Sequence, residues 1–267
     1  MFIRPVISSG GGIDDPTDIA NLVLWLDGSD ATTLYQTAGS QPFGLGSNAV
    51  TSTGDYVGCW ADKSGNDYHM NQSDTGRRPQ YNTNIANSLS AIEAFGSSPA
   101  YKLYSTSSVL TQDDEVTIFY VANRDANESY GVAYCNSNTY VPNGAKISSW
   151  VDTRSANKLG MVLQDSTTVN VAANPADIGT EFNLFSQQIT GGDIIARLNG
   201  TAGTAATIAG NGITENDYTR IFCEIDDGNP LDGYICELII YDTALSQSDI
   251  DLVEEWLQSK WATPALP

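Results

Sequence analysis

Carboxylate side chains in polar turns are the residues of this sequence whose type and spacing best suit them for chemistry. Hard cations such as Ca²⁺ take carboxylate and carbonyl oxygens as ligands, and the chain holds 32 Asp and Glu residues. No EF-hand spacing is present, so the alternative is that the acidic turns are simply solvated. We expect no required cofactor, and the candidate Ca²⁺ ligands are four loop aspartates: Asp27, Asp30, Asp62 and Asp67.

Tyrosines near polar loops are the second set of candidates. An aromatic ring offers a broad apolar face with a polar hydroxyl at its edge, and sugar rings stack on such faces. The alternative for each tyrosine is that it anchors its own loop to the core. The candidate ligand-binding residues are Tyr35, Tyr56, Tyr68 and Tyr101.

The charge balance and the histidine count exclude several classes of function. With 12 Lys and Arg against 32 Asp and Glu, the formal charge is −20, so the chain repels polyanions and should not bind nucleic acid. The single histidine, His69, rules out a zinc centre with several histidines. No G-x-S-x-G motif supplies a nucleophile for it, so we expect a structural or surface histidine.

Short strands separated by turns must position these residues. The strongest, residues 116–122, is β-branched and aromatic throughout, whereas residues 35–56 hold no convincing strand and predict a long surface loop. The spacing favours a two-sheet all-β sandwich. Strands are expected at residues 22–27, 57–60, 116–122, 130–134, 146–151, 159–163, 167–171, 182–190, 194–198, 221–225 and 234–241.

One amphipathic helix is predicted near the C-terminus. Ser246 is a natural N-cap, and Asp249 stands three residues on, at the capping-box spacing. Acidic residues fill the first half of the helix and Lys260 stands at its end, which suits the helix dipole. The apolar positions share one face, which we expect to pack on the sandwich: Ile250, Val253, Trp256, Leu257 and Trp261.

The first residues predict an arm in front of a single domain. Residues 1–17 hold a short apolar piece, a Gly/Ser hinge and an Asp-Asp-Pro turn, without the pattern of a signal peptide. We place the domain at residues 18–267. No stretch approaches the roughly 20 apolar residues of a membrane span, so no membrane insertion is expected. The four cysteines lack CxxC spacing and are expected to be buried free thiols.

Three separated segments resemble a known family of folds. They are LWLDGSD at residues 24–30, WADKSGN at 60–66 and GYICELIIYDTALS at 233–246. Together they resemble concanavalin A-like, laminin G-type jelly-roll domains, in the form found in bacteriophage structural proteins and bacterial surface proteins. The resemblance implies a two-sheet antiparallel jelly-roll sandwich with one C-terminal amphipathic helix. It identifies architecture better than ligand.

The same resemblance implies a non-enzymatic structural or adhesion protein of a phage virion. A head fibre, a decoration protein or a tail-tip component would contact other capsid or tail proteins through residues 1–17, would bind host-surface glycan and would be assembled in the host cytoplasm. A homo-oligomer is expected by the same analogy. A stand-alone cellular lectin that binds carbohydrate is the alternative of another class.

A glycoside hydrolase is the third reading of the resemblance. Laminarinase-like enzymes with this fold carry two catalytic carboxylates on one strand in an E-x-D-x-x-E pattern. The nearest run begins at Glu224 and Asp226 but has Asn229 where the second glutamate should stand, and a turn replaces the continued strand. We therefore predict that the protein is not an enzyme and that it has no catalytic residues.

Overall fold

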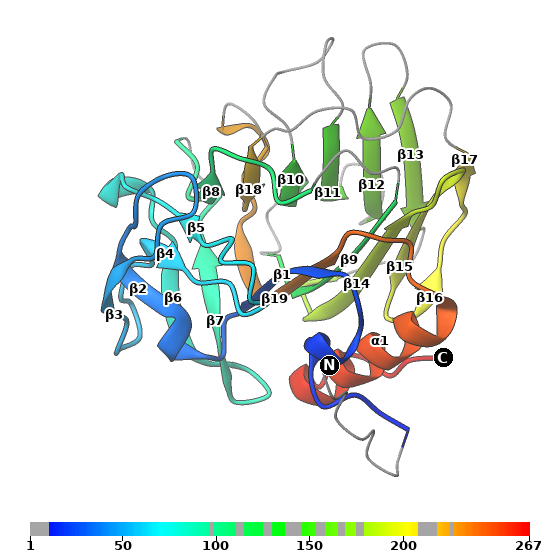
Figure 1. Ribbon diagram of the computed structural model, residues 1–267, viewed down its shortest axis with the longest axis horizontal. Helices are drawn as coiled ribbons and strands as arrows, with labels where there is room; N and C mark the ends of the chain where they lie inside the picture. The colour runs from blue at the N-terminus through cyan, green and yellow to red at the C-terminus, as the bar shows by residue number, and fades with distance from the viewer. Residues whose placement is uncertain are drawn as a thin grey trace, which may run out of the picture.

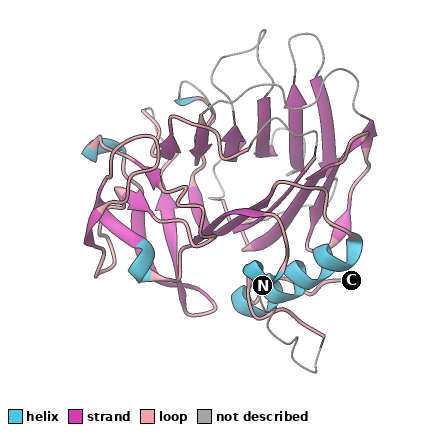
Figure 2. Ribbon diagram, in the orientation of Figure 1, coloured by secondary structure: helices cyan, strands magenta, loops and turns pink. Residues whose placement is uncertain are grey.

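Two antiparallel β-sheets face each other in the computed structural model (Figures 1 and 2). Apolar side chains from both sheets meet between them and form a hydrophobic core. This architecture, with one helix near the C-terminus, confirms the predicted jelly-roll sandwich. The structure describes residues 11–96, 99–110, 115–124, 130–136, 146–152, 158–164, 169–174, 179–207, 218–224 and 227–267.

Sheet 1 runs in the order β16-β15-β14-β9-β19-β7-β6, with β1 also paired to β19 and β17 to β15. Its strands are β1 (Leu22–Asp27), β6 (Gln80–Ala86), β7 (Leu89–Ala94), β9 (Val116–Ala122), β14 (Asn183–Ile189), β15 (Asp193–Leu198), β16 (Thr201–Ala202), β17 (Ala206–Thr207) and β19 (Gly233–Tyr241).

Sheet 2 runs in the order β13-β12-β11-β10-β18-β8-β5-β4-β2-β3. Its strands are β2 (Leu34–Thr37), β3 (Ser47–Ala49), β4 (Cys59–Trp60), β5 (Met70–Asn71), β8 (Leu103–Ser105), β10 (Tyr130–Asn136), β11 (Lys146–Asp152), β12 (Lys158–Gln164), β13 (Val169–Asn174) and β18 (Thr219–Ile221). Short 3₁₀ helices lie at η1 (Pro16–Asp18), η2 (Ala31–Thr33) and η3 (Thr75–Arg77).

Sheet 1 is buried on both faces, which explains why its strands are apolar along their whole length. In β19, Leu238 and Ile240 face sheet 2, while Ile239 and Tyr241 face the helix α1 (Gln247–Trp261). Figure 1 shows α1 lying across the sheet on the side away from β10 to β13. An alternating polar and apolar pattern is therefore absent from β19, as expected for a strand covered on both faces.

The helix α1 begins as the sequence predicts. Ser246 is the N-cap, and its Oγ accepts a hydrogen bond from the backbone N–H of Asp249 at 3.2 Å. Ile250, Val253 and Leu257 are buried against sheet 1. The described chain before β1 joins the same layer, because the Trp256 indole N–H donates to the Asp14 carbonyl at 3.0 Å.

Several sequence predictions need correction. Residues 35–56 are not strand-free, since most of β2 and all of β3 lie there. These strands were missed because β3 is short, polar and exposed, so it carries no hydrophobic alternation. The strand predicted at 221–225 ends at Ile221. Strands β5, β6, β7 and β8 were not foreseen, and part of the strand predicted at 167–171 lies outside the described residues.

The expectation for the cysteines agrees with the structure. All four cysteines are buried and free. Among the described residues, no helix has the length and the apolar character that crossing a membrane would require.

β1 and β7 pair with consecutive parts of β19 and so meet end to end along it. This junction depends on Gly28. Its N–H donates to the Cys236 carbonyl at 2.8 Å, and a Cβ atom there would lie 2.8 Å from that oxygen and 3.4 Å from the Ala91 Cα. We expect Gly28→Ala to lower the free energy of unfolding by about 1–3 kcal/mol, measured by urea denaturation, because backbone must move. Gly192→Ala meets open space and is the matched control; equal stability of both variants would contradict the close packing.

Candidate functional site

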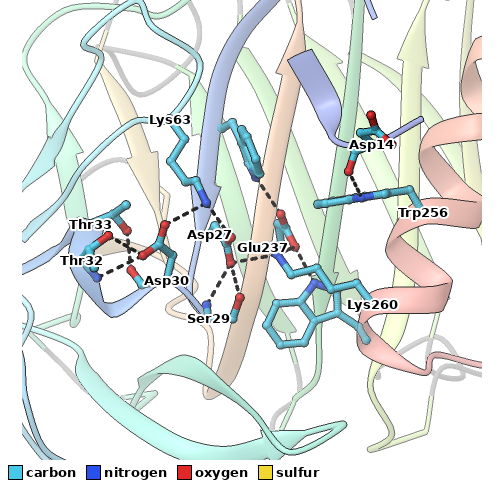
Figure 3. Close-up of polar contacts among 12 residues, drawn as sticks. Asp14, Asp27, Ser29, Asp30, Thr32, Thr33, Lys63, Glu237, Trp256 and Lys260 are labelled. Atoms are coloured by element: carbon cyan, nitrogen blue, oxygen red, sulfur yellow. Dashed lines mark hydrogen bonds and ion pairs between the residues drawn. The ribbon is translucent and has the colours of Figure 1, made fainter. Parts of the chain in front are cut away.

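The three signature segments meet at one buried ionic centre (Figure 3). Asp27 at the end of β1 has its Oδ2 2.9 Å from Lys63 Nζ, which follows β4. Its Oδ1 lies 2.9 Å from Lys260 Nζ in α1. The same ammonium lies 2.8 Å from Oε2 of Glu237 in β19. The Asp27 carboxylate thus contacts two lysines that lie far apart in the sequence. We name Asp27, Lys63, Glu237 and Lys260 the ionic centre.

Indole groups enclose the ionic centre. The Glu237 side chain is 0% exposed, and its two oxygens accept hydrogen bonds from Trp25 Nε1 at 2.7 Å and Trp261 Nε1 at 2.5 Å. Lys260 Nζ lies over the rings of Trp256 and Trp261, 4.9 and 5.2 Å from their centroids. A buried carboxylate held by a cation and two N–H donors has its hydrogen-bonding capacity met.

The pKa values of the two carboxylates in the ionic centre, Asp27 and Glu237, shift in opposite directions. Burial and the nearby charge of Asp27 raise the pKa of Glu237 from 4.5 to about 7, although Lys260 and Trp25 oppose the rise. Burial would also raise the pKa of Asp27, but Lys260, Ser29 and Lys63 lower it below its ordinary value. The ionic centre therefore pairs an ionised aspartate with a glutamate that gains a proton near neutral pH.

The turn after β4 is organised by Asp62. Oδ1 accepts from the backbone N–H groups of Trp25 at 2.9 Å and Ser64 at 2.8 Å, and Oδ2 accepts from the N–H of Tyr68 at 3.0 Å. His69 Nδ1 in turn accepts from the Asp62 N–H at 3.1 Å, which confirms a structural histidine. This turn fixes Lys63 beside β1.

The four candidate calcium ligands are not brought together as one set. Lys63 Nζ lies between Asp27 and Asp30, 2.9 Å from an oxygen of each. Asp62 accepts backbone hydrogen bonds, and the Asp67 side chain is 87% exposed. Within the described part of the chain, no group of three or more His, Cys, Asp or Glu side chains is arranged to hold a metal. Calcium binding stays a prediction, and a cation at Asp27 and Asp30 would have to displace Lys63.

The four candidate tyrosines differ in burial and in what they pack against. Tyr68 packs on the core with its ring 4.8 Å from that of Phe43, and Tyr101 packs on the core 5.3 Å from the ring of Phe95. Tyr35 is half-buried in β2. Tyr56, at 46% exposure, is the most accessible of the four. Ligand binding by these tyrosines stays a prediction.

The described part of the E-x-D run lies beyond the end of strand β18. Glu224 follows the end of β18, and its Oε2 accepts a hydrogen bond from Asn229 Nδ2 at 2.9 Å. Asp226 lies outside the described residues. Asp227 is ion-paired with Lys102 and with Arg77 at 2.6 Å, and these cations lower its pKa against the effect of burial. The described carboxylates of this run are thus engaged within the protein.

A recess opens between the two sheets where β9 ends and β14 begins. About 270 Å³ of empty space lies there, part of it continuous with solvent. Its apolar floor includes Tyr120 and Phe185, whose stacked rings are 4.7 Å apart at an interplanar angle of 19°. The lining residues are Tyr120, Ala122, Asn123, Arg124, Ala133, Gly179, Glu181, Asn183, Phe185 and Leu231.

Amide side chains hold the polar rim of the recess in place. Asn123 Oδ1 accepts from the N–H of Tyr234 at 3.0 Å. Asn183 Nδ2 donates to the Glu181 carbonyl at 2.9 Å, and Asn183 Oδ1 accepts from Asn199 Nδ2 at 2.8 Å. The rim therefore presents a carboxylate, a guanidinium and two fixed amides around an apolar floor, a composition typical of small-ligand sites.

Sequence reasoning missed this recess. Asn123 and Arg124 directly follow the strongest predicted strand, and Glu181 precedes another, so polar residues at strand ends were a usable signal. What the sequence lacked was the pairing of β9 with β14, which brings Ala122 opposite Asn183. Antiparallel pairing places the end of one strand beside the start of the other.

Comparison with known proteins shows likeness in fold. No protein-family model and no curated protein matches the sequence. Domain 4 of AbnA, an extracellular arabinanase of Geobacillus stearothermophilus solved with arabinotriose, has a TM-score of 0.61 at 14% identity, over 87% of this chain and 98% of that one. The receptor-binding domain of botulinum neurotoxin D has a TM-score of 0.58 at 12% identity, over 88% of this chain and 52% of that one. The match to the Streptococcus pneumoniae sialidase NanB has a TM-score of 0.47 at 14% identity, over 53% of this chain and 24% of that one.

The hydrogen bond from Trp261 to Glu237 should contribute measurably to stability. Trp261→Phe keeps an aromatic ring but removes a donor to a buried carboxylate, so we expect a loss of about 1.5–3 kcal/mol in urea denaturation. Trp256→Phe removes an exposed hydrogen bond to the Asp14 carbonyl and is the control, with an expected loss below about 1 kcal/mol. Similar losses in both would contradict a special role for the buried bond.

The raised pKa of Glu237 should appear in the pH dependence of stability. Because its pKa is about 7 in the folded protein against 4.5 in the unfolded chain, folding takes up a proton between these values. The contribution of this group to the free energy of unfolding is therefore fully present below pH 4.5 and is lost as pH rises through about 7. In Glu237→Gln this component should vanish, as urea titrations at pH 5 to 8 can check; parallel pH profiles would disprove the shift.

Proposed function

We propose that this chain is a non-catalytic carbohydrate-binding domain that contacts sugar at the rim of the recess at the ends of β9 and β14. The observation that carries the proposal is the lining of the recess, in which an aromatic floor lies beneath a carboxylate, a guanidinium and two amides.

The rim chemistry favours a neutral, hydroxyl-rich ligand. A sugar hydroxyl both donates and accepts, so it can donate to the Glu181 carboxylate and accept from the Arg124 guanidinium. Asn123 and Asn183 offer amide groups beside them. The formal charge of −20 acts against polyanionic glycans.

The number of carboxylates supports binding rather than hydrolysis. Most glycoside hydrolases need two carboxyl groups flanking the scissile bond. Among the described residues that line the recess, Glu181 is the only one with a carboxylate. Glu224 begins the run that comes nearest to a hydrolase pattern, and its carboxylate accepts a hydrogen bond from Asn229 Nδ2.

Two fold neighbours support the proposal by analogy. Domain 4 of AbnA was solved with arabinotriose, and the neurotoxin domain is described as receptor-binding. Both share the two-sheet sandwich with this chain at 14% identity or less, so they supply a precedent for a binding role on this fold.

The virion role stays a prediction from the resemblance. So do its location in a virion, a homo-oligomer, contacts to capsid or tail proteins through residues 1–17, and the alternative of a cellular lectin. Residues 14–16 contact the domain itself, because the Asp14 and Pro16 carbonyls accept hydrogen bonds from Trp256 and Tyr241. Any anchoring by the arm would start from this attachment.

A glycan array followed by calorimetry tests the binding site. We expect neutral oligosaccharides, with arabinotriose as the first probe in solution, to bind the wild-type protein. Ala122→Leu places extra carbons in the recess and should weaken binding at least tenfold, and Glu181→Gln should weaken it by about tenfold, because a charged hydrogen-bond partner is lost.

Glu255→Gln is the matched control, because Glu255 is exposed on α1. This substitution removes the same charge at a position away from the recess. Unchanged melting temperatures would show that the variants fold. Equal affinity in all variants, silence of the whole array, or release of reducing sugar would each contradict the proposal.

A further inference from the structure

The ionic centre brings together an amine, a carboxyl carbon and a proton acceptor. We propose that Lys260 and Asp27 condense to an intramolecular amide bond, with Glu237 carrying the proton. Lys260 Nζ lies 2.9 Å from Asp27 Oδ1 and 2.8 Å from Glu237 Oε2 (Figure 3). The three groups come from β1, β19 and α1, so the site is complete only in the folded chain.

Proximity supplies much of what the reaction needs. Held in reactive geometry, intramolecular partners reach effective molarities of roughly 10⁵–10⁸ M. The Lys260 ammonium is confined by the rings of Trp256 and Trp261, and Asp27 is confined by Ser29, whose N–H and Oγ donate to Oδ1 at 3.0 and 2.6 Å. Both reactants are therefore fixed before any chemistry occurs.

Burial favours the product over the ion pair. The Asp27 side chain is 6% exposed and that of Glu237 is 0% exposed. Charges in such surroundings are costly, and condensation replaces one ammonium and one carboxylate with a neutral amide. The water that forms leaves toward the solvent on the side where Lys260 is 19% exposed.

The step balances without any further reactant. Lys260 gives one proton to Glu237, which passes it to Asp27 Oδ1, and the neutral amine then forms a C–N bond to the carboxyl carbon of the uncharged acid. The second proton lost from nitrogen reaches Oδ1 through Glu237 by the same route. The C–Oδ1 bond breaks, one water leaves, and Glu237 ends as it began. The pKa of Glu237, raised to about 7 by burial and by Asp27, suits such a carrier.

Lys63 has a different part in this reaction. Its Nζ lies 2.9 Å from Asp27 Oδ2, the oxygen that is retained, where it would stabilise the negative charge of the tetrahedral intermediate. Asp30, at 2.9 Å, and Asp27 raise the pKa of Lys63 against the effect of burial, so it stays an ammonium and is no competing nucleophile. The contacts of Lys63 and Lys260 thus give Lys63 an electrostatic role and Lys260 a nucleophilic one.

Mass spectrometry of the intact, full-length protein tests the proposal. After folded protein is incubated at pH 7 to 8, we expect its mass to lie one water below that of the sequence, and a digest to contain two peptides joined through Asp27 and Lys260. A wild-type protein that keeps the full sequence mass would overturn the proposal.

Succinimide formation would change the mass by the same amount and must be distinguished from formation of the amide bond. Asp27 precedes Gly28, and an aspartyl–glycyl bond can cyclise to a succinimide with loss of one water. The Gly28 nitrogen that would have to attack is engaged with the Cys236 carbonyl at 2.8 Å. Lys260→Arg keeps the cation but removes the amine nucleophile, so it should keep the full mass; water loss in this variant would assign the change to the succinimide and overturn the proposal.

Glu237→Gln tests the proton carrier. General acid–base groups contribute roughly 10²–10⁴-fold to rates, so the variant should form the link at least about 100-fold more slowly than wild type. Circular dichroism should show that the variant is folded. Formation at the wild-type rate would remove Glu237 from the mechanism. Asp251→Asn on the exposed face of α1 is the control and should link normally.

Discussion

A carboxylate on a strand that is covered on both faces is the constraint around which this fold is arranged. Glu237 cannot reach water, so every hydrogen bond to it must come from the protein. Trp25 in β1 and Trp261 and Lys260 in α1 meet that need. The demand of one buried side chain thus fixes how the first strand and the last helix attach to the middle of sheet 1.

Sheet 1 is covered on one face by sheet 2 and on the other by α1, and the arrangement of the core follows from this. The inner layer of side chains makes the core with sheet 2, and the outer layer makes a second core with α1. The recess lies where the inner layer ends, past Ala122, and its polar residues stand on the backbone that leaves β9 and enters β14. The recess and the ionic centre therefore lie on different faces of sheet 1.

Sequence patterns predicted the sandwich, β9, β19 and the capped helix α1 because these elements combine strong local signals. The residues 116–122 match β9, and Ser246 is the N-cap. The three signature segments identified the architecture, but their convergence could not be foreseen, since residues such as Lys63 and Lys260 meet only through tertiary packing. Exposed polar strands such as β3 and the recess were missed because neither leaves a periodic pattern.

The position of the ionic centre also governs how the domain would carry tension. Asp27 belongs to the first strand and Lys260 to the last helix, while the described segments 11–18 and 261–267 flank them along the chain. A force applied at these two flanks first loads the hydrogen bonds of Asp14 and Pro16 and the pairing of β1 with β19, and Asp27 lies at the far end of that pairing. The contact between Asp27 and Lys260 therefore adds a second connection between β1 and α1 behind the hydrogen bonds of β1 with β19.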